Sequence, residues 1–127
     1  MKRYNIEEVL KHVVVPDDEN LLRYSKKYKK KVDFDGDSIK VSSDRLLLFK
    51  TKGCKCVVCG IEGTYFQKTP NGDSGTFHFN LYATNEEGEK VLMTKDHIQP
   101  KSKGGLDCQA NYQTMCEDCN MEKGAKV

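Results

Sequence analysis

The amino-acid sequence predicts a small α+β domain with a basic helical arm at its N-terminus, and three observations lead to this prediction. Aromatic and β-branched residues between residues 64 and 93, interrupted by turn signals, are typical of a small antiparallel sheet. Two pairs of cysteines with C-x-x-C spacing flank these predicted strands. A run of lysines lies upstream of both, close to residue 30. A chain of 127 residues has the length of one domain with an appended arm.

The composition predicts a modest hydrophobic core. Only 37% of the residues are hydrophobic, 31% are charged and tryptophan is absent, so we expect a stabilising metal or cross-link. The net charge of +2 does not by itself indicate a nucleic-acid partner. No apolar run approaches the length that spans a membrane and no signal peptide is evident. We therefore expect an intracellular protein without a membrane partner.

Residues 1–43 are predicted to form a basic extension made of helices and a hairpin. Apolar side chains have helical spacing over residues 4–14, although three consecutive valines favour extended structure there, and Pro16 ends either one. Acidic residues after this proline suit the start of a second helix, from about residue 21 to residue 30. The segment 32–41 is predicted to form a hairpin that turns at an Asp-Gly pair.

The second of these predicted helices is strongly basic, and two of its tyrosines share one face. In the functional interpretation the arm contacts the phosphates of a nucleic acid, with aromatic support. In the alternative interpretation the charges form a solvated helix face whose tyrosines pack on the core. The side chains that would contact phosphate are Arg23, Lys26, Lys27, Lys29 and Lys30.

Residues 44–127 are predicted to form the main domain. Ser43 or Asp44 could cap a short apolar helix through residues 45–49, which would deliver the chain to the first cysteine pair. Strands are predicted over residues 64–66, 76–82 and 90–93.

Two C-x-x-C pairs predict a structural zinc site, because four cysteine sulfurs can bind one ion tetrahedrally. The pairs lie far apart in the chain, so the ion would clamp distant segments together. Cys54 is an alternative ligand, and Cys108 has no assigned role. A disulfide framework of all six cysteines is the other interpretation, and the lack of an evident signal peptide disfavours it. The predicted zinc ligands are Cys56, Cys59, Cys116 and Cys119.

A second constellation consists of Asp96, His97, Asn111 and Asn120, whose side chains suit acid–base and metal chemistry. Imidazole can take a proton from water near neutral pH. Carboxylate and amide oxygens suit a hard divalent cation. Singly, each residue is more simply explained as a turn cap, a buried histidine or a residue that holds a loop. All four together, beside a cysteine pair, favour a functional site.

Three segments carry a family resemblance: MTKDHIQPKSKGG from Met93 to Gly105, Asn111, and CEDCNMEKG from Cys116 to Gly124. Together they resemble the motif of the HNH endonuclease family, in its zinc-binding subset. Asn120 stands where the family name has histidine, which gives an HNN-type motif. The resemblance covers about residues 44 to 125 and implies a ββα-metal finger. Its strands would lie around residues 91–97 and 111–115, followed by a helix from about Glu117 to Lys123.

The resemblance also implies roles for these residues. His97 would activate water, and the side-chain oxygen of Asn111 would accept a ring N–H from it. Asp96 and Asn120 would bind a catalytic Mg²⁺ or Mn²⁺. Lys123, one turn after Asn120, could face the same DNA phosphate, as could Lys95, Lys101 and Lys103, and a solvated lysine is the equal alternative for each. A single centre of this kind would nick DNA, so double-strand cutting would need a homodimer or repeated nicking. Many family members are encoded by phages or mobile elements.

A catalytically degenerate, zinc-containing nucleic-acid-binding module is the alternative function. Such a module would keep the four cysteines and the basic arm but would not turn over substrate. The presence of Asp96, His97 and Asn120 favours the enzyme.

Overall fold

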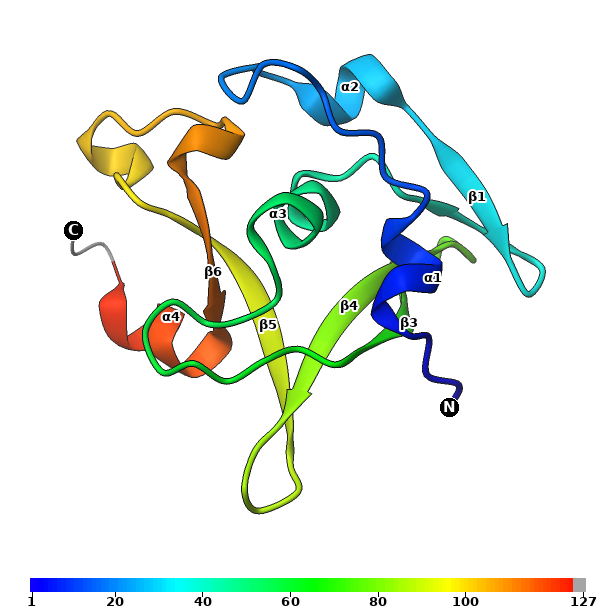
Figure 1. Cartoon of the computed structure of the whole chain (residues 1–127). Coiled ribbons are helices and arrows are strands. Elements are labelled where there is room, and N and C mark those ends of the chain that lie inside the picture. Colours follow the sequence, from blue (N-terminus) through cyan, green and yellow to red (C-terminus); the bar gives the residue numbers. More distant parts are fainter. Residues whose placement is uncertain (125–127) are drawn as a thin grey trace.

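A four-stranded antiparallel sheet is the main element of the computed structural model, which describes residues 1–124. Its strand order is β3-β4-β5-β6, so each strand pairs with the next one along the chain. Figure 1 shows β4 and β5 joined by a hairpin, with β6 on the far side of β5. The strands are β3 (Tyr65–Pro70), β4 (Phe77–Thr84), β5 (Lys90–His97) and β6 (Tyr112–Cys116). The predicted α+β class with a small antiparallel sheet is confirmed.

The N-terminal extension contains two short helices and a hairpin. The hairpin consists of β1 (Lys31–Phe34) and β2 (Asp37–Lys40), and it turns at Asp35-Gly36 as predicted. Both turn residues have positive φ, as a two-residue hairpin turn requires. The helices are α1 (Ile6–Leu10) and α2 (Tyr24–Tyr28).

Both helices are shorter than the sequence pattern predicted, for local reasons. A capping box between Asn5 and Glu8 starts α1, and the valine run that follows it lies outside any helix or strand. Arg23 and Lys29 bound α2, and both have left-handed backbone conformations that a helix cannot continue. The arm is therefore mostly irregular chain with two short helices, and in α2 only Lys26 and Lys27 are exposed.

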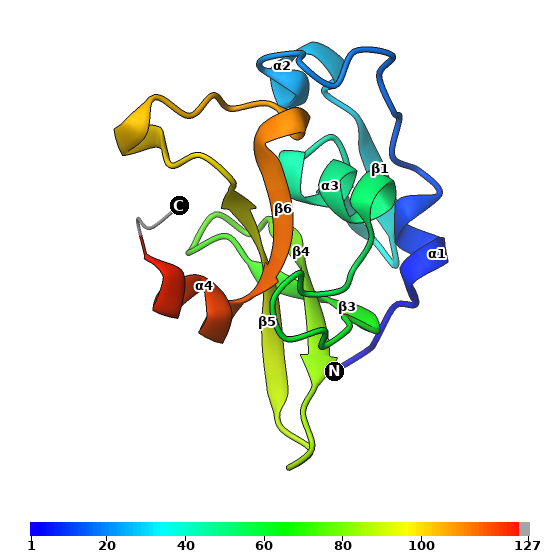
Figure 2. The same ribbon diagram turned by 60° about the vertical axis from the view of Figure 1, so that its left-hand side comes forward.

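Two longer helices flank the pair of strands β5 and β6. α3 (Asp44–Lys52) begins at Ser43, whose Oγ accepts a hydrogen bond from the backbone N–H of Leu46 at 3.2 Å. Ser43 rather than Asp44 is thus the cap. α4 (Glu117–Lys123) follows β6 directly. Figure 2 shows α3 and α4 on opposite sides of the β5–β6 pair.

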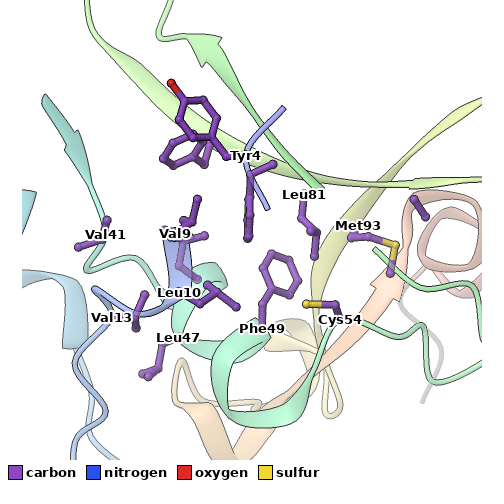
Figure 3. Close-up of a cluster of buried hydrophobic side chains, with 14 of the residues drawn as sticks. Tyr4, Val9, Leu10, Val13, Val41, Leu47, Phe49, Cys54, Leu81 and Met93 are labelled. Atoms are coloured by element: carbon purple, nitrogen blue, oxygen red, sulfur yellow. The ribbon is translucent and has the colours of Figure 1, made fainter. Parts of the chain in front are cut away.

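One hydrophobic cluster joins the N-terminal extension to the rest of the chain. Figure 3 shows Val9, Leu10 and Val13 of the extension packed near Leu47 and Phe49 of α3. Tyr4 also forms an isolated β-bridge with Phe66 of β3. The division into residues 1–43 and 44–127 stays a prediction, and the two parts share one core. None of the helices among residues 1–124 has the length and the apolar composition of a membrane-spanning segment.

Replacing Phe66 by alanine should lower the free energy of unfolding by about 3–5 kcal/mol. Its side chain is fully buried, and its ring lies 5.9 Å from that of Phe79 and 6.4 Å from that of Phe49. Urea unfolding of the metal-loaded protein measures this change. Leu22→Ala is the control, because Leu22 is 51% exposed and should change stability by less than about 0.5 kcal/mol. Equal losses in both variants would contradict the assigned core.

Candidate functional site

The segment β5–β6–α4 forms the predicted strand–strand–helix unit. β5 and β6 pair antiparallel, with His97 opposite Tyr112 and Met93 opposite Cys116. Consecutive side chains of a strand leave opposite faces. Asp96 accordingly contacts α4, whereas the ring of His97 lies on the other face against Tyr112, with ring centroids 5.1 Å apart. The two adjacent residues therefore have separate sets of partners.

Four cysteine side chains meet beside this unit. The Sγ atoms of Cys56, Cys59, Cys116 and Cys119 all lie within 4.8 Å of one another. The Cys59 and Cys116 sulfurs are 3.8 Å apart. A tetrahedral zinc with Zn–S bonds of about 2.3 Å needs sulfurs about 3.8 Å apart, so this geometry fits such an ion. The cluster could hold a metal such as zinc, and Cys54 lies outside it in the hydrophobic core.

The electrostatics of the cluster also fit a cation. Burial opposes ionisation of the Cys56 thiol, but hydrogen bonds with backbone groups of Cys59, Cys116 and Val58 outweigh it and lower the pKa of Cys56 to about 6. Burial and the neighbouring sulfurs raise the pKa of Cys116 and Cys119. Four thiols this close ionise together only when a positive ion compensates their charges.

Local backbone geometry explains why the sulfurs converge. The N–H of Gly60 donates to the carbonyl oxygen of Cys56 at 3.0 Å, and Gly60 has a φ of 80° that suits glycine. A second bond, from the Val57 N–H to the Thr114 carbonyl oxygen at 3.0 Å, fastens this turn to β6. Cys116 is both the last residue of β6 and the N-cap of α4.

Asp96 is a buried carboxylate on the α4 side of β5. Only 5% of the residue is exposed, and its Oδ2 accepts from Lys123 Nζ at 2.6 Å and from Gln113 Nε2 at 2.9 Å. The same Lys123 ammonium donates to the backbone oxygen of His97 at 2.7 Å. Asn120 donates through Nδ2 to Thr94 Oγ1 at 2.9 Å. Its Oδ1 accepts no hydrogen bond from the part of the chain that the structure describes.

His97 pairs with an acid that the sequence pattern did not single out. Its Nε2 lies 2.7 Å from Oδ1 of Asp107, and Lys101 Nζ lies 3.0 Å from the other oxygen of that carboxylate. These two partners lower the pKa of Asp107 to about 2, so the group is ionised at neutral pH. An ionised carboxylate on one ring nitrogen fixes both the tautomer and the orientation of an imidazole.

The side chain of Asn111 makes no hydrogen bond to the His97 ring, in contrast to the role predicted for it. Its Oδ1 accepts the backbone N–H of Gln99 at 2.9 Å, and its Nδ2 donates to the carbonyl oxygens of Gln99 and Leu106 at 3.0 and 2.9 Å. All three bonds hold the loop between β5 and β6. Asn111 thereby fixes the segment that carries Asp107, and its action on His97 is indirect.

The basic residues of the arm fall into two groups. Arg23 and Lys26 line a cavity together with His97, and Lys27, Lys29 and Lys30 are not among its lining residues. Lys123, also predicted to contact DNA, is 15% exposed in its side chain and is engaged by Asp96.

Sequence reasoning missed Asp107 and Gln113. The signal for Asp107 was its place in the loop that follows His97, since antiparallel pairing of residues 97 and 112 folds that loop back beside the histidine. Gln113 lies opposite Asp96 in the register, which is the same kind of signal.

A shallow cavity of about 350 Å³ at the end of β5 brings three of the four predicted catalytic residues together. Asp96, His97 and Asn120 all line it, as do Lys95 and Lys101. It is thus bordered by one carboxylate, one imidazole, one amide and two ammonium groups. Such a set can bind an anion, hold a divalent cation and accept a proton.

One comparison with known proteins finds a similarity in this part of the chain. Residues 82–127 match the sequence model of a family described as HNH endonuclease, which covers less than half of the chain but all of β5, β6 and α4. No curated protein and no solved structure gives a significant match. The C-terminal segment from residue 82 to residue 127 is therefore similar to the HNH endonuclease family.

Proposed function

We propose that the protein is a metal-dependent HNH endonuclease that hydrolyses phosphodiester bonds of DNA. One observation carries this proposal: the cavity that touches His97 also touches Asp96 and Asn120, within the segment that matches the family. One such centre acts on one strand at a time, so a single copy nicks duplex DNA. Cutting both strands needs two copies acting together or a second nicking event.

His97 is the proposed general base. The Asp107 carboxylate holds its Nε2, which leaves the other ring nitrogen to take a proton from the attacking water. Asp107 also stabilises the imidazolium that this transfer creates, because its own low pKa keeps it negative. Asn111 supports the pair by holding the loop in place.

Asp96 and Asn120 are the proposed ligands of a catalytic Mg²⁺ or Mn²⁺. A buried carboxylate and a free amide oxygen are hard oxygen donors that suit these ions. When bound, such an ion supplies charge stabilisation for the phosphate and the leaving oxygen. Lys123 already lies on Asp96, and two cations on one carboxylate repel each other. The Lys123 ammonium would then be released from Asp96 and become available to a DNA phosphate.

The four-cysteine cluster is proposed to hold a structural zinc. The sulfurs offer no open position, as is usual for structural sites. Arg23, Lys26, Lys27, Lys29 and Lys30 are proposed to contact DNA phosphates and to give salt-sensitive affinity that is largely independent of base sequence.

A binding module without turnover is the second candidate, and one observation favours it. Lys123 and Gln113 already satisfy the Asp96 carboxylate, as they would in a site that no longer binds a cation. Cleavage assays separate this candidate from the enzyme, since both bind DNA.

Purified protein should nick supercoiled plasmid DNA when Mg²⁺ or Mn²⁺ is added. His97→Ala should slow nicking by about 10²–10⁴-fold, the usual contribution of a general base. Gel electrophoresis of the plasmid forms measures the rate, and elemental analysis checks that both proteins carry equal metal. Equal nicking by the two proteins would remove His97 from the mechanism. DNA binding without nicking by either would favour the binding module.

Replacing Asp107 by asparagine should lower kcat by about 10-fold and leave KM for DNA nearly unchanged. The reason is that asparagine keeps the shape but loses the charge that stabilises the imidazolium. Asp107→Glu should restore part of the rate. Asp73→Asn is the control, because it makes the same change at an exposed residue that lines neither cavity at His97. A loss of kcat in Asp73→Asn as large as that in Asp107→Asn would contradict the assigned role.

Replacing Cys116 by alanine should remove the metal and unfold much of the chain. Structural zinc contributes on the order of 10–16 kcal/mol of apparent binding energy, which matches or exceeds the 5–15 kcal/mol net stability typical of a domain. Elemental analysis and circular dichroism measure the two effects, and the first also identifies the metal. Cys54→Ala is the matched control, since Cys54 is also buried but lies outside the cluster. Full metal content in Cys116→Ala would overturn the assignment.

A further inference from the structure

A second cavity, of about 410 Å³, lies on the arm side of His97. Arg23, Ser25 and Lys26 of the arm line it, together with His97 and Lys101. Figure 2 shows how this arises, because α2 lies close to the start of β6, next to the end of β5. Lys95, His97 and Lys101 line this cavity and also the one that touches Asp96. The two cavities are therefore neighbours that share a wall.

Only two of the four permanently charged cations that line the second cavity have a carboxylate partner among residues 1–124. Of its four permanent cations, Lys101 lies 3.0 Å from Asp107 and Lys95 lies 3.9 Å from Asp44. Within residues 1–124, the side chains of the other two, Arg23 and Lys26, make neither an ion pair nor a hydrogen bond. The unpaired positive charge thus comes from the arm alone, and it faces the histidine proposed as the base.

The arm is fixed in this position. The N–H of Ala110 donates to the carbonyl oxygen of Glu19 at 3.0 Å, which fastens the arm to the turn before β6. Tyr24 is 2% exposed, and its hydroxyl donates to the carbonyl oxygen of Val14. Arg23 itself has a φ of 57°, a left-handed conformation that is uncommon for a residue other than glycine. The surrounding contacts hold it there, and its side chain is presented at the cavity.

Tyr112 adds an independent observation. It is 1% exposed and lines the cavity, yet its buried hydroxyl has no hydrogen-bond partner in the described part of the chain. Buried hydroxyls are nearly always paired. Burial, followed by the charges of Asp44, Asp107 and Cys108, raises the pKa of Tyr112, so this hydroxyl keeps its proton and remains a donor. Asp107 also acts on it as a hydrogen-bond acceptor in this shift, but no acceptor among residues 1–124 meets the hydroxyl with hydrogen-bond geometry, and an anion in the cavity would provide one.

We propose that this second cavity binds a non-scissile phosphate of the DNA strand that is cut. Arg23 and Lys26 supply the charge, and the Tyr112 hydroxyl supplies a donor. The neighbouring phosphate of the same strand then lies in the first cavity, at His97 and Asp96. This inference rests on the proposed action on DNA. Arg23 and Lys26 then position the DNA strand. The other basic residues of the arm, Lys27, Lys29 and Lys30, add affinity that does not depend on this position.

DNA binding tests the arm side of the subsite without any cleavage. Fluorescence anisotropy of a short, labelled, mixed-sequence duplex gives Kd over a series of salt concentrations, without added divalent cation or chelator. Arg23→Gln/Lys26→Gln should reduce the slope of log K against log salt by about 0.9, because the cavity binds one phosphate and each neutralised phosphate contributes about 0.9. Lys31→Gln/Lys55→Gln removes the same charge from exposed residues outside the cavity and should change the slope by much less. Equal changes in both pairs would overturn the subsite.

Tyr112→Phe tests the hydroxyl by two measurements that should move in opposite directions. Removing an unpaired buried hydroxyl should leave the melting temperature of the free protein unchanged or raise it. The same change should weaken duplex binding roughly 10- to 150-fold, as loss of a hydrogen bond to a charged group does. A purely structural tyrosine would lower both stability and affinity together, and unchanged affinity would exclude the hydroxyl from the subsite.

The outcomes separate this inference from the proposed function. Salt slopes that follow the prediction, in a protein that does not nick plasmid DNA, would keep the phosphate subsite and remove the nuclease. If the wild-type protein nicks plasmid DNA but the two charge-neutralised double variants bind DNA alike, the nuclease would be kept and the subsite removed.

Discussion

The convergence of four sulfurs constrains the rest of the site. Cys56 and Cys59 lie in the turn after α3, and Cys116 and Cys119 lie at the junction of β6 and α4, so the cluster joins segments that are distant in the chain. Thiolates at these separations repel one another unless a cation lies between them. Because Cys116 also caps α4, the cluster decides where that helix begins. It thereby sets which residues of α4, among them Asn120 and Lys123, face β5.

Strand alternation explains why the site has two sides. Asp96 and His97 are neighbours in β5, and their side chains leave opposite faces of the strand. Asp96 contacts Lys123 of α4 and Gln113. His97 contacts Asp107 of the following loop and lines a cavity together with residues of the arm. The proposed chemistry needs both residues at one phosphate. Both side chains can face one phosphate because they lie at the end of β5, where a single cavity is lined by Asp96 and His97.

Sequence spacing alone predicted the features that depend on neighbouring residues or on the ligand chemistry of a motif. The C-x-x-C pairs predicted the metal cluster, the Asp-Gly pair predicted the β1–β2 turn, and the motif around His97 predicted the strand–strand–helix unit. The bond from His97 to Asp107 could not be predicted in this way, because it depends on the path of an irregular loop. Asn111 was expected on the imidazole but holds that loop instead. The length of α2 was overestimated, since propensity does not reveal that Arg23 and Lys29 adopt left-handed conformations.

The shared core has a consequence for any attempt to use the nuclease segment as a portable module. A fragment that starts at α3 would lose Val9, Leu10 and Val13, which cover the helix, and Tyr4, which bridges to the edge strand β3. That edge and that apolar face would then be open to other chains, and both are known routes to aggregation. A fusion partner is therefore better joined to either end of the 127-residue chain than to a fragment that starts at α3.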